Sequence, residues 1–237
     1  GNEIEIVKLK RADDGAISKA GFIGIIIDLN SIEYVKGIVT KYFTNESRLE
    51  YASVLNVGTG SEGIILDKLF YTHWGPLTIR NNPAAGVGSG LVLRPTVDGL
   101  SSINSHDIPQ IEIVGMQDGI LIDTAVAQIN TLRVVGSVEA CVNAVTYTNG
   151  LGINEANFRL HMEGNTRNAN WFGTSSGGPG LIEWDGTWND SAGGDVKLGS
   201  SNHYFRPRIV GSVNLFKWGP ARAKTVGSSF VDQGGTS

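Results

Sequence analysis

The sequence has few of the residues that build disulfide frameworks and no run that resembles a membrane helix. Its 237 residues include a single cysteine, Cys141, so no internal disulfide can form, and Cys141 is expected to be a buried small side chain. The longest apolar run, residues 22–29, contains Gly24 and Asp28 and is far shorter than the about 18 residues that span a bilayer. We therefore expect neither a disulfide-stapled mini-protein nor insertion into a membrane.

Basic side chains are scarce in the middle of the chain. Residues 97–195 carry 12 acidic and 3 basic side chains, whereas residues 196–237 carry 1 acidic and 6 basic ones. Contacts to phosphates need lysine and arginine, so the acidic region argues against a nucleic-acid partner.

The four histidines are scattered without metal-ligand spacing, and no CxxC or HExxH motif occurs. The sequence indicates neither a metal site nor another cofactor.

Glycine, in contrast, is abundant. The chain contains 32 glycines and only 7 prolines, and this is roughly twice the ordinary glycine share of about 7%. Glycine adopts the positive backbone angles that tight turns require. The composition therefore indicates many turns between short strands.

The dominant pattern is a doublet that recurs along the chain. A short strand pattern and a turn precede a second apolar strand that opens on glycine or alanine. The first strands of the doublets are expected at residues 55–58, 77–79, 111–115, 132–136 and 158–164, and the second strands at 63–66, 90–93, 119–122 and 140–142. Strand-only units with a repeat of 20–30 residues stack as the coils of a β-helix. We predict an all-β chain, a right-handed parallel β-helix with a β-rich C-terminal cap.

The doublets divide the chain into three predicted regions. Residues 1–50 form an N-terminal β-rich or capping segment, residues 51–170 form the parallel β-helix, and residues 171–237 form a C-terminal β-rich cap or oligomerisation region. Residues 31–42 are compatible with a capping helix, but their Val, Ile, Thr and Tyr content also favours a strand. Insertions between the strands, such as residues 70–74, are where recognition would be built.

The repeat itself suggests one catalytic pair. Glu62, Ser89, Asp118 and Glu139 each precede a second strand, and stacked strands place equivalent residues about 4.8 Å apart. Asp118 and Glu139 would then lie in adjacent coils at the separation of the two carboxyl groups of a retaining glycosidase. The alternative is that these carboxylates accept hydrogen bonds in turns and face water.

Tryptophan and acidic residues together suggest sugar contacts. The candidates for substrate binding are Trp171, Trp184, Trp188, Asp185 and Trp74. Aromatic rings can stack on the CH faces of a sugar while carboxylates bind its hydroxyls. A structural cluster in a turn-rich cap is the alternative.

The chain resembles the β-helical tailspike and tail-fibre proteins of bacteriophages. The resemblance lies in the glycine-cornered doublets, in the coils of unequal length and in the segment rich in Asn, Gly and Trp after residue 165. Pectate-lyase-like enzymes share the same kind of coil. The resemblance implies a homotrimer in the virion, contacts to other virion proteins, and binding of bacterial surface polysaccharide outside the cell during attachment. It also leaves open a polysaccharide hydrolase or lyase that uses paired carboxylates. A purely structural virion appendage or decoration protein is the third possibility.

Overall fold

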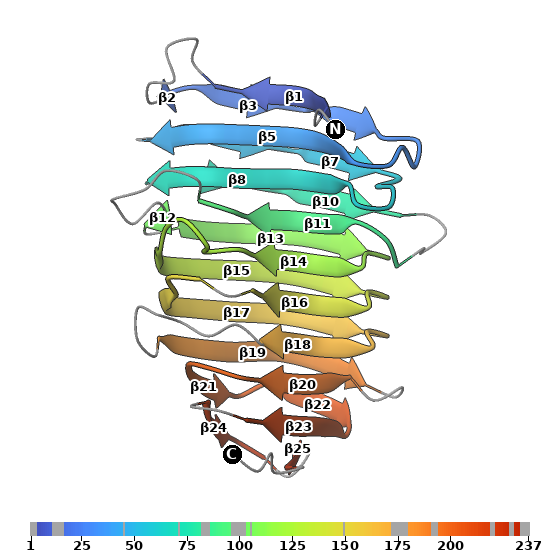
Figure 1. The fold of residues 1–237 in the computed structure, drawn as a ribbon, viewed down its shortest axis with the longest axis vertical. Coiled ribbons are helices and arrows are strands. Elements are labelled where there is room, and N and C mark those ends of the chain that lie inside the picture. Colours follow the sequence, from blue (N-terminus) through green and yellow to red (C-terminus); the bar gives the residue numbers. More distant parts are fainter. Residues whose placement is uncertain are drawn as a thin grey trace.

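The computed structural model describes residues 4–10, 17–44, 46–70, 72–81, 86–95, 103–104, 106–148, 150–171, 180–190, 194–218, 221–227 and 230–232. In this part of the chain every regular element is a β-strand, and every strand pairing is parallel. The strands coil around one long axis with the two termini at opposite ends (Figure 1). The predicted all-β fold and the parallel β-helix are confirmed.

One side of the coil is a ladder of parallel strands, which we call the front ladder (Figure 1). Its members, in stacking order, are β1 (Ile4–Leu9), β5 (Val35–Thr44), β8 (Glu62–Phe70), β11 (Ser89–Leu93), β14 (Asp118–Ile122), β16 (Asn143–Tyr147), β18 (Arg167–Trp171), β20 (Asp195–Leu198), β23 (Val213–Lys217) and β25 (Phe230–Asp232). Each strand pairs with the next through backbone hydrogen bonds, so equivalent residues form columns along the axis.

The opposite side is the back ladder, which contains the longest strands. Its members are β4 (Ile26–Asp28), β7 (Ala52–Leu55), β10 (Leu77–Arg80), β13 (His106–Val114), β15 (Ile129–Glu139), β17 (Ile153–Glu163), β19 (Leu181–Asp190), β21 (Asn202–Phe205), β22 (Arg208–Gly211) and β24 (Arg222–Thr225). The predicted first strands at 77–79, 111–115, 132–136 and 158–164 lie in this ladder, whereas the one predicted at 55–58 begins where β7 ends, and Asn56 turns the chain with a positive φ of 53°.

Short strands lie beside both ladders near the N-terminal end. They are β2 (Ile17–Ser18), β3 (Gly21–Ile23), β6 (Arg48–Glu50), β9 (His73–Trp74) and β12 (Ile103–Asn104). β2 pairs with β5 of the front ladder, and β12 pairs with β8 of the front ladder and with β15 of the back ladder. β3, β6 and β9 stack in that order, and β9 pairs with the first half of β13 while β10 pairs with its second half. The long strands of the middle coils thus span two sheets that are separate in the first coils.

A column of small residues explains why the second strands open on glycine. A Cβ at Gly63 would lie 2.9 Å from the carbonyl oxygen of Gly90, and a Cβ at Gly90 would lie 2.6 Å from that of Gly119. Successive coils therefore approach closely enough at this corner to leave little room for a side chain. The next member of the column is Ala144, because β14 and β16 pair with Ile120 opposite Val145.

The prediction of residues 140–142 as the fourth second strand is wrong. β15 continues to Glu139, and Ala140 turns the chain with a positive φ of 53°. The strand that stacks on β14 is β16, which begins at Asn143. The apolar stretch from Ala140 fits a strand by composition, but Cys141 lies in the corner, where its backbone NH donates to Asn165 Oδ1.

The parallel pairing continues across both predicted region boundaries. β1 stacks on β5 at the N-terminal end, and β20 to β25 continue the coil beyond residue 171. The three-region division stays a prediction, since pairing alone does not define folding units.

Residues 35–44 form strand β5, which confirms the strand alternative for most of residues 31–42. No helix of the described residues is long and apolar enough to cross a membrane.

The interior of the coil changes character along its axis. Ile, Leu and Val side chains fill most of the first coils, with Phe43 stacked on Phe22 and on Trp74. Towards the C-terminal end the core is aromatic and comprises Tyr147, Phe158, Trp171, Trp184, Trp188 and Phe205.

Cys141 is buried as expected, and its burial raises the pKa of its thiol to about 11. The thiol therefore stays protonated and unreactive at neutral pH.

His203 lies inside the aromatic core and is neutral there. Its Nδ1 accepts a hydrogen bond of 3.1 Å from Trp184 Nε1, so the ring proton is on Nε2, which donates to the carbonyl oxygen of Ser200 at 2.7 Å. Burial lowers the pKa of His203 to about 4. Both hydrogen bonds suit the neutral ring, because a protonated Nδ1 could not accept from the indole.

This burial predicts a loss of stability in mild acid. Between pH 6.5 and about 4 the unfolded chain binds a proton on His203 that the folded chain excludes. The stabilisation is fully present above pH 6.5 and is lost as the pH falls towards 4, by up to about 1.4 kcal/mol per pH unit. Chemical denaturation at several pH values should show a shallower dependence for His203→Gln than for the wild type. Equal slopes for the two proteins would contradict the assignment.

Candidate functional site

The predicted catalytic pair is not stacked. Asp118 begins β14 in the front ladder, where its register partners are Ser89 and Asn143. Glu139 ends β15 in the back ladder, where its register partners are Val114 and Glu163. The adjacency expected of Asp118 and Glu139 is therefore wrong, because it depended on a second strand at residues 140–142.

Asp118 is held by neighbours in the next coil. Its Oδ1 accepts hydrogen bonds from Asn143 Nδ2 at 2.9 Å and from Thr146 Oγ1 at 2.5 Å. Arg167 in the following coil donates to Asn143 Oδ1 at 3.2 Å. The carboxylate is thus one end of a chain of hydrogen bonds along the front ladder, and this arrangement favours a structural role for Asp118.

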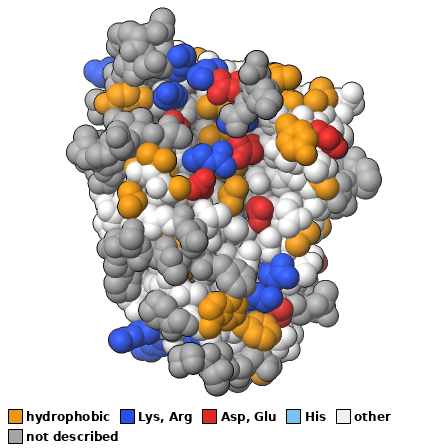
Figure 2. Space-filling view, viewed as in Figure 1, with side chains coloured by type: hydrophobic (Ala, Val, Ile, Leu, Met, Phe, Trp, Pro, Cys, Tyr) orange, Lys and Arg blue, Asp and Glu red, His pale blue; other side chains and the backbone are white. Residues whose placement is uncertain are grey.

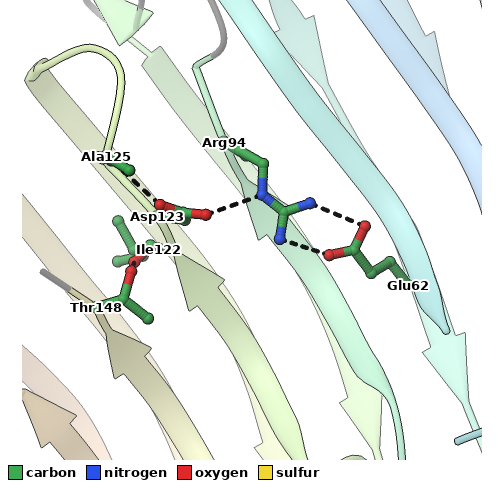
Figure 3. Close-up of polar contacts among 6 residues, drawn as sticks. All are labelled: Glu62, Arg94, Ile122, Asp123, Ala125 and Thr148. Carbon is green, nitrogen blue, oxygen red and sulfur yellow. Dashed lines mark hydrogen bonds and ion pairs between the residues drawn. The ribbon is translucent and has the colours of Figure 1, made fainter. Parts of the chain in front are cut away.

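Arg94 holds three coils of the front ladder together. Its guanidinium contacts Glu62 in the preceding coil at 2.6 Å and Asp123 in the following coil at 3.0 Å (Figure 3). Burial alone would lower the pKa of Arg94, but the hydrogen bonds and charges of the two carboxylates outweigh it and raise the pKa, so the group stays charged. Figure 2 shows basic and acidic side chains side by side on this face.

The back ladder brings polar side chains into register on its outer surface. Val138 and Met162 point into the core, so Ser137, Glu139, His161 and Glu163 beside them face outward. We call the two resulting rows the polar columns; they consist of Glu112, Ser137, His161 and Thr187, and of Val114, Glu139, Glu163 and Asn189. All eight residues are at least partly exposed.

Glu163 is the most connected member of the polar columns. It contacts His161 Nε2 at 3.1 Å and accepts a hydrogen bond from Asn189 Nδ2 at 3.1 Å. The side-chain carboxylate of Glu139, its register neighbour, has no hydrogen-bond or ion-pair partner among the described residues. The adjacent carboxylates that the repeat predicts therefore exist, but they are Glu139 and Glu163.

The tryptophans proposed for sugar contact are core residues. Trp171, Trp184 and Trp188 are 0% exposed and Trp74 is 2% exposed, so none presents a ring face to a ligand in solvent. The expected stacking platform is wrong for these four, because the inward positions of the strands are where the coil needs large apolar side chains. Asp185 lies on β19 beside Trp184 and accepts a hydrogen bond from the backbone NH of Gly186.

An open hollow lies at the N-terminal end of the back ladder, and sequence reasoning missed it. It encloses about 440 Å³ and is lined by Lys19, Ala20, Gly21, Glu46, Arg48, Glu50 and His73. Gly21, Arg48 and His73 are register partners in three successive coils. Only His73 falls in the insertion at residues 70–74. The other residues belong to strands of two or three residues or to turns, which leave no periodic signal.

Within the described part of the chain, no group of three or more His, Cys, Asp or Glu side chains is placed to hold a metal ion. Comparisons of the chain with protein-family models, with curated proteins and with solved structures found no match.

Proposed function

We propose that this chain is a β-helical binding module of a bacteriophage tailspike or tail fibre, and that it binds bacterial surface polysaccharide. The observation that carries the proposal is the pair of polar columns on the back ladder. A polysaccharide is a periodic chain of hydroxyl groups, and the columns offer donors and acceptors that repeat once per coil, about 4.8 Å apart.

The same columns support binding better than the front ladder does. On the front ladder Asp118, Asn143 and Arg167 already bind one another. On the back ladder Ser137, Glu139 and Thr187 have no side-chain partner among the described residues. Side chains that keep their hydrogen-bonding capacity free are the ones available to a ligand.

The proposal includes a setting in the virion. We take the module to act outside the bacterial cell during attachment, as a homotrimer in contact with other virion proteins. A straight parallel stack with continuous surfaces suits side-by-side association of identical chains. A native mass of three chains is the expected measurement, and a stable monomer would contradict this part of the proposal.

A panel of bacterial surface polysaccharides tests the binding function. We expect the protein to bind at least one of them, and the double variant His161→Ala/Thr187→Ala to bind about tenfold more weakly, which is the loss of about 1.4 kcal/mol expected for one or two hydrogen bonds. Lys197→Ala on the front ladder is the control and should bind as the wild type does. Binding of no polysaccharide would favour the purely structural appendage.

The pair Glu139 and Glu163 gives the enzyme alternative a specific basis. The two are register partners in adjacent strands, and strands about 4.8 Å apart suit the about 5 Å carboxyl separation of a retaining glycosidase. A depolymerase should shorten the polysaccharide that it binds, and Glu139→Gln should abolish the shortening while the polysaccharide still binds to the other members of the polar columns. Unchanged chain length with the wild-type protein would exclude this alternative for that polysaccharide.

A further inference from the structure

The hollow at the N-terminal end combines opposite charges that do not pair with each other. Two lining side chains are cationic, two are anionic and one is an imidazole. In the part of the chain that the structure describes, no hydrogen bond or ion pair is formed by the side chains of Lys19, Glu46, Arg48, Glu50 or His73. Elsewhere exposed charges do pair, as Arg133 does with Asp107 and Arg206 does with Glu183.

The backbone keeps the hollow open for the Arg48 side chain. Gly21 lies beside Arg48 in the preceding coil, and a Cβ at Gly21 would lie 2.9 Å from Arg48 Nε. His73 follows Arg48 in the next coil. Any other residue at position 21 would therefore make the Arg48 side chain shift, and this contact links Gly21 to the hollow.

The donor set selects the charge of a ligand. Lysine and arginine only donate hydrogen bonds, and ionised glutamates only accept them. A purely anionic group would be attracted by Arg48 and Lys19 but repelled by Glu46 and Glu50. A purely cationic group would be attracted by the two glutamates but repelled by Arg48 and Lys19. A ligand with both charges can satisfy both pairs, and about 440 Å³ lies within the usual range for small-molecule sites.

We propose that the hollow binds a zwitterionic substituent of a glycan, in which a phosphate or carboxylate contacts Arg48 and Lys19 while an ammonium group contacts Glu46 and Glu50. The inference rests on the proposed glycan-binding function and specifies a ligand class for it. The guanidinium can hold the anionic group through two parallel hydrogen bonds. His73 is placed to hydrogen-bond the sugar to which the substituent is attached.

Calorimetric titration with small probes tests the charge requirement. The probes are phosphoethanolamine and 2-amino-2-deoxyglucuronic acid, which distinguish a phosphate from a carboxylate, together with glycerol phosphate and ethanolamine, which carry charge of one sign only. We expect a zwitterion to bind at least tenfold more tightly than either probe with charge of one sign. Equal affinity for the zwitterions and for these two probes, or binding of none, would overturn the proposal.

Single substitutions separate the two halves of the hollow. Arg48→Gln should lower the affinity for the zwitterion about tenfold, because it removes the guanidinium from the anionic group. Gly21→Ala should lower it less, since a Cβ at position 21 only displaces the Arg48 side chain. Glu50→Gln should also weaken the zwitterion but should strengthen glycerol phosphate, since it removes a repelling charge. Arg222→Gln and Glu155→Gln, exposed residues elsewhere in the coil, are the matched controls. Unchanged zwitterion affinity in Arg48→Gln would refute the assignment.

The outcomes distinguish this inference from the function on which it rests. If the protein binds surface polysaccharides with and without zwitterionic substituents equally well, the binding function stands and the hollow is not the selective site. If phosphoethanolamine binds in the hollow but no surface polysaccharide binds the protein, the inference about the hollow stands and the polysaccharide function fails. Because all of these side chains are at least partly exposed, circular dichroism should show the variants to be folded.

Discussion

Replacing Trp184 by alanine should lower the free energy of unfolding by about 3–5 kcal/mol, the range for loss of a buried aromatic side chain. Trp184 is fully buried between Phe158 and Phe205, with ring centroids 4.9 and 5.8 Å away, and its indole donates to His203. Three coils contribute these rings, so the substitution opens a cavity at the centre of the aromatic core. Thermal unfolding should shift down by about 10 °C or more.

Trp184→Phe is the control for this cavity. It retains a ring between the two phenylalanines but leaves His203 Nδ1 without its donor. We expect a loss of about 1–2 kcal/mol, close to the cost of one buried hydrogen bond together with a small reduction in volume. An alanine variant as stable as the phenylalanine variant would show that the aromatic stack contributes little to stability.

Replacing Gly136 by alanine should cost about 2–4 kcal/mol, from a strained backbone and a steric overlap. Gly136 has a φ of 147°, and a Cβ there would lie 2.1 Å from the carbonyl oxygen of Ile111. The register between β13 and β15 shifts between Ile108 and Ile111, so Gly136 lies opposite a bulge where the two strands approach closely. Denaturant titration gives the change directly.

Gly24→Ala separates the two contributions. Gly24 also has a positive φ, 76°, but a Cβ there would meet nothing within 4 Å. Its substitution should therefore show the backbone cost alone, about 1–2 kcal/mol. Equal losses at Gly24 and Gly136 would mean that the contact with Ile111 relaxes without cost.

Several elements of the coil are predictable from local pattern. The second strands at Gly63, Gly90 and Gly119 are found where the doublets predict them, because alternation of apolar residues and glycine corners are local features of the chain. The pattern misplaces the strand after Glu139, since Ala140 to Val142 are as apolar as the strand that follows. A bend at a corner and a strand have the same composition when both face the core.

The site residues were harder to predict for a related reason. In a parallel stack the neighbour of a residue is set by the register between coils, and a shift of a few residues replaces one neighbour by another. Asp118 therefore lies beside Asn143 instead of Glu139, and Glu139 lies beside Glu163. Composition likewise marked the tryptophans as notable but could not show whether they face inward or outward.

The sequence by itself determined the parallel β-helix, because glycine spacing and strand alternation are local patterns that extend over a few residues and can be recognised in the sequence alone. Only the tertiary structure decided which charges meet. Arg94 binds Glu62 and Asp123 from coils on either side, while Arg48 in its hollow has no such partner in the described chain. The physical reason is that stacking brings together residues about a coil apart in sequence, and the unequal length of each coil fixes which ones.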